Sequence, residues 1–291
     1  MRNILLFFAM FVLISCEQEA EIDIPHPKER IVLNAILQEG ELFKLHLSKS
    51  SYALDTVIRY VDNAVVNVFS EDTLLEVLKY SQEGFYYSDQ LIVKEGVCYS
   101  VEVLVPGYNN LLAHTCVPSP VRLQSVSLKT DAGKDNKGIS YSLVEISFKD
   151  PVNTENYYYI SLISRNLDTF YTHLYRDNAF FFSYSPIILA EGDKSSKVFS
   201  DKTFNGQEVL LPLNYYDFKA DTVTKRRLTL KLFSVSESFY LYQKSLAEYQ
   251  KAINDIFRVN NPPQLYSNVE NAYGIFSAVA VSDSINIDYN Y

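Results

Sequence analysis

The chain has 291 residues, a formal net charge of −9 at pH 7 and a hydrophobic content of 47%. This content is typical of a folded globular protein, and the length is enough for two ordinary domains. An acidic body repels phosphate backbones, so nucleic acid is excluded as an expected partner. The aromatic residues are 23 Tyr and 18 Phe with no Trp, and because Tyr and Phe favour strands, the sequence predicts a mostly β fold.

The first 16 residues have the layout of a secretory signal that ends in a cysteine. Arg2 precedes an apolar run from Ile4 to Ile14, and small or apolar residues then lead to Cys16. The run is shorter than the roughly 20 residues that span a bilayer, and it fits the apolar core of a signal peptide. The pattern resembles the bacterial lipobox, which implies a removed signal over residues 1–15 and a lipid on Cys16. An uncleaved anchor or a buried N-terminal strand is the alternative.

Residues 16–30 are expected to form an acidic, extended tether. Four acids fall between Glu17 and Asp23, and Pro25 and Pro27 follow, as in a solvated linker. An acidic run directly after a lipidated cysteine also resembles the surface-export signals of Bacteroidota lipoproteins. We therefore expect anchoring in the outer membrane through Cys16, on the periplasmic or the cell-surface face, with the surface favoured. A plain spacer is the alternative interpretation of the acidic run.

Residues 31–120 are predicted to form a prealbumin/Ig-like β-sandwich, because short alternating strands follow one another between turn signals. The expected strands are 31–37, 43–48, 64–70, 74–80, 84–88, 98–105 and 111–117. Pro118-Ser119-Pro120 is expected to end this domain as a stiff linker.

The last two of these strands form a predicted hairpin around the turn cluster Pro106–Asn110. The register that sorts apolar from polar residues pairs Val101 with Ala113 and also places Cys98 opposite Cys116. Opposed Cβ atoms of an antiparallel pair lie within about 5.5 Å, which is near disulfide reach. The sequence therefore predicts a cross-strand disulfide, with two free thiols on a half-exposed face as the alternative.

Residues 121–291 are predicted to form a larger β-rich domain with one amphipathic helix near 235–257. Ser234 and Glu237 fit a capping box. Apolar residues then recur at helical spacing and are expected to pack into the core; they are Phe239, Tyr242, Leu246, Tyr249 and Ile253. The last ten residues are polar, and we expect them to fray.

Several segments, in this order along the chain, resemble one known family. They are the lipobox with its acidic follow-on, Ile31–Leu37, Leu45–Ser50, the hairpin from Gly96 to Pro118, Phe199–Gly206, Ser238–Tyr242 and Tyr266–Phe276. The chain resembles the Bacteroidota lipoprotein family catalogued as domain of unknown function 4249. The resemblance implies an outer-membrane lipoprotein, often encoded beside a TonB-dependent receptor, with no established chemistry. The family more often has threonine-like residues where this chain has Cys98 and Cys116, so the resemblance does not imply the disulfide.

No motif predicts a reaction, a metal or a cofactor. The four histidines, His26, His46, His114 and His173, are scattered, and neither they nor the cysteines have the spacing of a zinc site. No nucleophile elbow and no phosphate-binding glycine loop is present. Asp150 and Asp201 end predicted strands, but turn formation explains Asp150 equally well, and neither is nominated as catalytic.

Two further features are candidate sites. Four Asp-Thr or Asp-Ser tripeptides resemble an O-glycan acceptor pattern of Bacteroidota envelope proteins, with acceptors Thr56, Thr73, Thr222 and Ser284. The segment that contains Asn268, Tyr273, Gly274 and Phe276 is either a recognition surface for a receptor or a loop that completes the fold, with Gly274 supplying a special backbone angle. We favour the second interpretation.

The expected function is that of a non-catalytic outer-membrane lipoprotein, an accessory or binding subunit of a TonB-dependent transporter. An envelope hydrolase acting on glycans or peptides is the first alternative. It requires a concave pocket with paired carboxylates. A structural or adhesive surface protein is the second alternative, and it requires an open edge strand.

Overall fold

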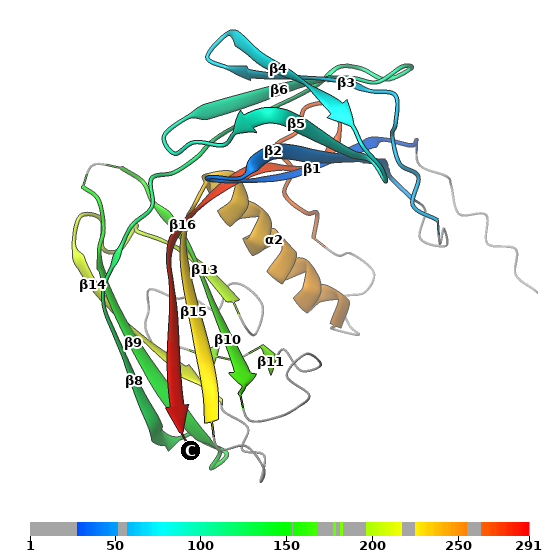
Figure 1. The fold of residues 1–291 in the computed structure, drawn as a ribbon. Coiled ribbons are helices and arrows are strands. Elements are labelled where there is room, and N and C mark those ends of the chain that lie inside the picture. Colours follow the sequence, from blue (N-terminus) through cyan, green and yellow to red (C-terminus); the bar gives the residue numbers. More distant parts are fainter. Residues whose placement is uncertain are drawn as a thin grey trace, which may run out of the picture.

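The computed structural model is mostly β, with one helix in its C-terminal half, as the sequence predicts. Figure 1 shows two β bodies that meet at an angle, with helix α2 in the angle between them. The structure describes residues 28–51, 57–152, 154–167, 177–178, 181–182, 196–216, 225–254 and 263–290.

The N-terminal body is a sandwich whose strands form one continuous sheet that curls over on itself. Its strands are β1 (Ile31–Gln38), β2 (Leu42–Lys49), β3 (Val65–Ser70), β4 (Thr73–Tyr80), β5 (Phe85–Ile92), β6 (Cys98–Leu104) and β7 (Leu111–Cys116). They lie in the spatial order β1-β2-β5-β4-β3-β6-β7. Because β4 pairs with both β3 and β5, the two halves of the sheet face each other across a shared apolar core.

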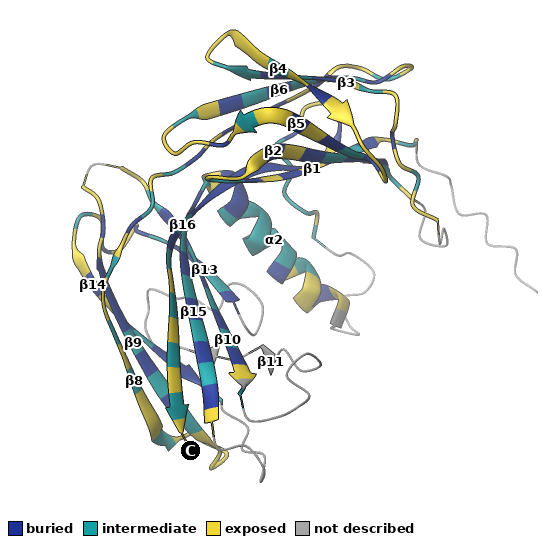
Figure 2. Ribbon diagram, in the orientation of Figure 1, coloured by how far each residue is buried: buried dark blue, intermediate teal, exposed yellow. Residues whose placement is uncertain are grey.

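Strand alternation decides which side chains enter that core. In β1, Ile31, Leu33, Ala35 and Leu37 are buried and the residues between them face outward. Figure 2 shows that β4 is, by contrast, exposed over most of its length. Truncating a fully buried leucine such as Leu33 to alanine is expected to cost about 2–5 kcal/mol.

The C-terminal body packs a four-stranded sheet, in the order β12-β14-β9-β8, against strands β10, β15 and β16 of the larger sheet. Its strands are β8 (Leu123–Lys134), β9 (Ser140–Lys149), β10 (Tyr157–Asn166), β11 (Asp177–Asn178), β12 (Phe181–Phe182), β13 (Ser196–Ser200), β14 (Glu208–Tyr215), β15 (Lys225–Val235) and β16 (Tyr273–Asn290). Its core is separate from that of the N-terminal body.

Strand β16 belongs to both bodies, which differs from the expected division of the chain at residue 120. Its first half pairs in parallel with β1, with Gly274 beside Leu33, and its second half pairs with β15 as far as Asn290. Val269 and Phe276 lie in the N-terminal core. The expectation that the last ten residues fray was wrong for Asp283–Asn290, which pair with β15 in this ladder. Tyr291 lies outside the described residues.

Helix α2 (Glu237–Asn254) lies within the predicted range, but its N-cap is not the predicted one. Ser236 caps it, since the Phe239 N–H donates to Ser236 Oγ at 3.3 Å. Ser234 is buried in β15, and its hydroxyl accepts from the Val121 N–H instead. The expected core stripe holds only in part, because Phe239 is buried whereas Ile253 is 48% exposed.

Candidate functional site

The segment before β16 closes the N-terminal sandwich through the side chain of Asn268. Phe276 N–H donates to Asn268 Oδ1 at 2.9 Å, and Asn268 Nδ2 donates to Phe276 O at 2.7 Å and to His114 O at 3.2 Å. Glu270 N–H donates to Leu112 O at 2.8 Å. The segment thus connects β7 to β16, and these bonds give Asn268 a structural role.

Gly274 and Phe276 also serve the fold, whereas Tyr273 lies at the surface. Gly274 has φ +113°, and a Cβ on it would lie 1.9 Å from Leu33 O, so only glycine fits beside β1. Phe276 is fully buried. Tyr273 is 40% exposed, and the Arg30 guanidinium lies 4.9 Å from its ring centroid.

A cleft of about 410 Å³ lies where the two bodies meet, next to Asn268. We call it the junction cleft. Its lining comes from the end of β7, the start of β10, the β15–α2 connection and the segment before β16. The lining residues are His114, Thr115, Cys116, Pro118, Glu155, Tyr157, Val235, Ser236, Glu237, Ser238, Tyr266 and Asn268.

The junction cleft combines two carboxylates with two phenols, of which Tyr157 is buried and Tyr266 is half-buried. Tyr157 is buried, and its pKa is raised first by that burial and then by hydrogen bonding to Glu155 and the charge of Glu237. Burial also raises the pKa of Tyr266, and the charge of Glu237 adds to the rise. The two phenols therefore stay neutral. Glu155 and Glu237 are the acidic side chains of the lining, and Lys202 Nζ lies 3.7 Å from Glu155 Oε1.

A second cleft of about 460 Å³ adjoins the first and shares His114 and Asn268 with it. We call it the hairpin cleft, because it follows the outer face of β6 and β7. Asp72, Glu102 and Glu270 line it. Among the described residues that line the two clefts there is no Lys or Arg, so together they favour a ligand or partner segment with positive charge.

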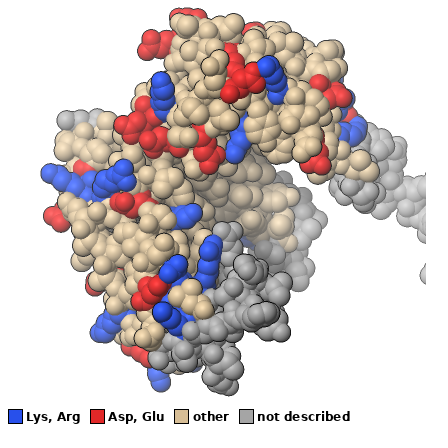
Figure 3. Space-filling view, viewed as in Figure 1, with Lys and Arg blue, Asp and Glu red and all other residues tan. Residues whose placement is uncertain are grey.

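A third groove, of about 490 Å³, lies between helix α2 and the outer face of β1, β2 and β5. Figure 3 shows the hollow between the two bodies, with mostly uncharged side chains visible in it. Ile36, Phe85 and Tyr242 give this groove an apolar and aromatic lining, with Lys44 and His46 beside them.

The β6–β7 hairpin has the predicted register, with Val101 opposite Ala113 and Cys98 opposite Cys116. The two cysteines are joined by a disulfide on the exposed face of the hairpin. Cys116 also lines the junction cleft. The disulfide therefore fixes one wall of that cleft.

The other predicted sites are less informative. Thr73 is exposed at the start of β4, and Ser284 is exposed within β16, opposite Lys231. Cys16, Thr56, Thr222, His26 and His173 lie outside the described residues. In the part of the chain that the structure describes, no cluster of three potential metal ligands is present, and no helix is long and apolar enough to cross a membrane.

Asp150 and Asp201 form a buried network that the sequence did not identify. Asp150 accepts from the Tyr158 hydroxyl and from Gly206 N–H, and Asp201 Oδ2 accepts from Asn156 N–H at 2.8 Å. Burial raises the pKa of Asp201, and the charge of Asp150 adds to the rise. Neither carboxylate lines any of the three clefts, so the network holds loops together.

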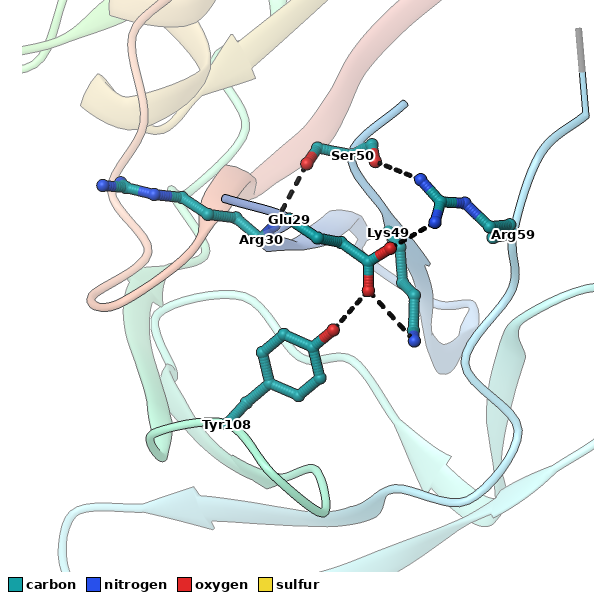
Figure 4. Close-up of polar contacts among 6 residues, drawn as sticks. All are labelled: Glu29, Arg30, Lys49, Ser50, Arg59 and Tyr108. Carbon is teal, nitrogen blue, oxygen red and sulfur yellow. Dashed lines mark hydrogen bonds and ion pairs between the residues drawn. The ribbon is translucent and has the colours of Figure 1, made fainter. Parts of the chain in front are cut away.

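The start of the folded body is fixed by Glu29, which the sequence placed in the tether. Figure 4 shows that its carboxylate accepts a hydrogen bond from the Tyr108 hydroxyl and forms ion pairs with Lys49 and Arg59. These three residues come from separate parts of the N-terminal body. The hydrogen bond from Tyr108 is the main reason that the pKa of Glu29 is lowered, followed by the one from Lys49. The expectation of a solvated tether up to residue 30 was therefore wrong for Glu29 and Arg30, whose N–H donates to Ser50 Oγ at 3.0 Å.

Comparison with known proteins identifies the family. A family model described as "Domain of unknown function (DUF4249)" matches residues 17–285. The chain belongs to the DUF4249 family. The DUF4249 assignment predicted from the motifs is thus confirmed. No curated protein matches this DUF4249 chain.

Solved structures similar to this DUF4249 chain are distant. Salmonella alpha-2-macroglobulin matches as a mutant, at 11% identity, and after reaction with methylamine, at 10% identity; both have a TM-score of 0.26 and cover 91% of this chain. This chain spans only 16% of that macroglobulin. The BSP domain of a biofilm associated protein has 5% identity and a TM-score of 0.23, covering 88% of this chain and 58% of its own. Similarities at these TM-scores carry no argument about function.

Proposed function

We propose that this DUF4249 protein is a non-catalytic Bacteroidota lipoprotein, held at the outer membrane by lipid on Cys16, that acts as an accessory or binding subunit of a TonB-dependent transporter. The lipobox, the acidic run after it and the family membership support the anchor and the setting. The cell-surface face is favoured because the acidic run after Cys16 resembles the surface-export signals of Bacteroidota lipoproteins.

The tether limits how far the body lies from the membrane. Twelve residues separate Cys16 from Glu29, and an extended chain of that length reaches about 40 Å. Glu29 is held to the body by Tyr108, Lys49 and Arg59, so the reach is counted from that point. The body therefore stays within contact distance of a barrel in the same membrane.

The observation that carries a binding role is the pair of adjoining clefts at the junction of the two bodies. They share His114 and Asn268, so a partner segment can run from one into the other. Their carboxylates favour a segment with Lys or Arg side chains, and the half-buried Tyr266 offers aromatic contact area beside the charge.

The experiment is a native purification from outer membranes. The protein carries a C-terminal tag, the membranes are extracted in mild detergent, and the co-purified proteins are identified and quantified. The account predicts one transporter-sized β-barrel in stoichiometric amount, which is lost in a Cys16→Ser variant. A protein that purifies alone from membranes that contain its anchor contradicts the proposal.

One observation favours a second candidate function, an envelope hydrolase. Glu155 and Glu237 both act on the buried Tyr157 in the junction cleft, and paired carboxylates are the catalytic groups of most glycosidases. A screen of glycan substrates tests this function with Glu155→Gln and Glu237→Gln variants. Turnover that either substitution abolishes supports the hydrolase, and turnover that survives both contradicts it.

A further inference from the structure

The second half of β16 has an open edge. Residues up to Val279 pair with β1 on one side, but beyond that point β16 pairs only with β15 among the described strands. On the side of β16 that faces away from β15, Arg122 and Leu123 pass near Ser282 and Asp283. There Leu123 N–H donates to Asp283 Oδ2 at 2.6 Å and Arg122 donates to Ser282 O at 2.8 Å. This leaves Ser284–Asn290 as an edge whose second side no described strand covers.

This edge lacks the features that usually protect an exposed strand. Natural edge strands are shortened, bulged, or carry Lys or Pro, because an unprotected edge pairs with another chain. Ser284–Asn290 contains no Lys, Pro or Gly, and its one charged residue, Asp288, is paired with Arg227 of β15 at 2.6 and 2.9 Å. The edge strand of the other sheet, β8, differs in this respect: it has register shifts at Leu123/Ser125 and Lys129/Gly133, and it carries exposed lysines.

The side chains along this edge alternate strictly. Ile285, Ile287 and Tyr289 are half-buried on the side of the C-terminal core, whereas Ser284, Asn286, Asp288 and Asn290 are exposed on the opposite side. A strand added in register would therefore meet an apolar row on one face and a polar row on the other.

The same segment is complementary to itself. An antiparallel copy centred on Ile287 pairs Ile287 with Ile287 of the copy, and Ile285 with Tyr289. The polar face then pairs Ser284 with Asn290 and Asn286 with Asp288, so no two aspartates oppose each other. We propose that two copies of this chain associate by antiparallel pairing of Ser284–Asn290 around a two-fold axis at Ile287.

A second copy is the occupant that this pattern favours, since all seven residues pair and apolar residues meet only apolar ones. Shifting the centre to Asn286 places Tyr289 opposite Asp283 on the apolar face, and shifting it to Asp288 opposes two aspartates. The centre at Ile287 avoids both. Such an isologous contact closes as a dimer and continues the sheet from one copy into the next.

Cysteine pairing tests the register in the full-length protein, purified in mild detergent. Asn286→Cys and Asp288→Cys variants are oxidised separately and as a mixture. In the proposed register, residue 286 lies opposite residue 288 of the copy, whereas two residues 286 are diagonal neighbours about 7–8 Å apart, beyond disulfide reach. The mixture is expected to give a disulfide-linked dimer, and each variant alone is expected to give none. Dimers from a single variant, no dimer from the mixture, or a link from residue 286 to a different protein each overturn the proposal.

A second variant tests the energetics without cysteines. Ile287→Lys places a charge on the two-fold axis and is expected to raise the dimer dissociation constant at least about tenfold, measured by sedimentation. Ile253→Lys, at a 48% exposed position of α2, is the matched control and is expected to leave the constant unchanged. A thermal melt confirms that both variants are folded. Equal dissociation constants for wild type and Ile287→Lys overturn the proposal.

Discussion

Asn268 and Phe276 are joined by two hydrogen bonds in which a side chain replaces a strand. The amide of Asn268 accepts from Phe276 N–H at 2.9 Å and donates to Phe276 O at 2.7 Å, as the backbone of a paired residue would do. The same amide also reaches His114 O on β7. Asn268 therefore connects β16 to the β6–β7 hairpin beside the junction cleft.

Replacing Asn268 with alanine is expected to lower the free energy of unfolding by about 1–3 kcal/mol, because the N–H of the buried Phe276 loses its acceptor, whereas Phe276 O keeps the hydrogen bond from Ser238 Oγ. Urea unfolding measures the change. Asn34→Ala, at an exposed asparagine on β1, is the control and is expected to change stability little. A loss for Asn268→Ala no larger than that of the control would contradict the role assigned to Asn268.

Gly274→Ala is expected to destabilise the protein by more than a positive backbone angle alone explains. Gly138 also has a positive φ, of +80°, but a Cβ added there would have no other atom within 4 Å, whereas at Gly274 the Cβ would strike Leu33 O. Gly138→Ala should therefore cost about 1–2 kcal/mol and Gly274→Ala clearly more. Thermal unfolding of both variants gives the comparison, and similar losses would show that β1 and β16 are not in close contact at this point.

Removing the disulfide with Cys98→Ser and Cys116→Ser is expected to cost about 2–3 kcal/mol, since the bond closes a loop with a sequence separation of 18. The double variant should unfold at a lower urea concentration than wild type. Wild type treated with a reductant should match the double variant. If the reductant leaves the midpoint of wild type unchanged, the two thiols are not bonded.

Glu29 is expected to make stability depend on pH in the acid range. Its pKa lies below the ordinary value of 4.5 because of Tyr108 and Lys49, so its contribution is complete above pH 4.5 and is lost as the pH falls through the lowered pKa. The stability difference between wild type and Glu29→Gln should therefore be constant at neutral pH and shrink in acid. Glu95→Gln, at an exposed turn residue, is the control. A difference that does not change with pH would contradict the assignment.

The buried pair Asp150 and Asp201 is expected to respond oppositely to amide substitution. Asp201 accepts both hydrogen bonds from Asn156 through one oxygen, and an asparagine at position 201 keeps such an oxygen. The pKa of Asp201 is raised in the folded state, so the folded protein loses stability as the pH rises through that pKa and the carboxyl ionises. Asp201→Asn should be neutral or stabilising at pH 7. Asp150 uses both oxygens, for Tyr158 and Gly206, so Asp150→Asn leaves a buried donor unpaired and should cost about 1–3 kcal/mol. Calorimetry measures the stability of both variants at pH 7. An equal loss of stability in Asp150→Asn and Asp201→Asn would contradict the different roles assigned to the two aspartates.

Much of the N-terminal body follows from local sequence signals. The strand expected at 31–37 is observed as Ile31–Gln38, the one at 98–105 as Cys98–Leu104, and the hairpin register is the predicted one. Alternation and turn residues carry this information because both act between near neighbours in the chain.

The rest depends on contacts between distant parts of the chain. The parallel pairing of β1 with β16 joins residues about 240 positions apart and leaves no local pattern. The capping-box prediction at Ser234 was wrong because that serine stays in β15, where Val121 and Ser282 use its hydroxyl. The clefts also bring together residues from Phe69 to Glu270, so no spacing along the chain indicates them.

The central claim, that a partner binds through the clefts at the junction, is tested most directly by reversing their charge. Glu155→Lys with Glu237→Lys changes the junction cleft, and Glu95→Lys with Glu208→Lys makes the same charge change at exposed positions outside the clefts. The amount of partner that co-purifies from outer membranes is the quantity measured. The account predicts at least about a tenfold loss for the cleft variant and a retained partner for the control. Equal recovery of the partner with both variants would contradict it.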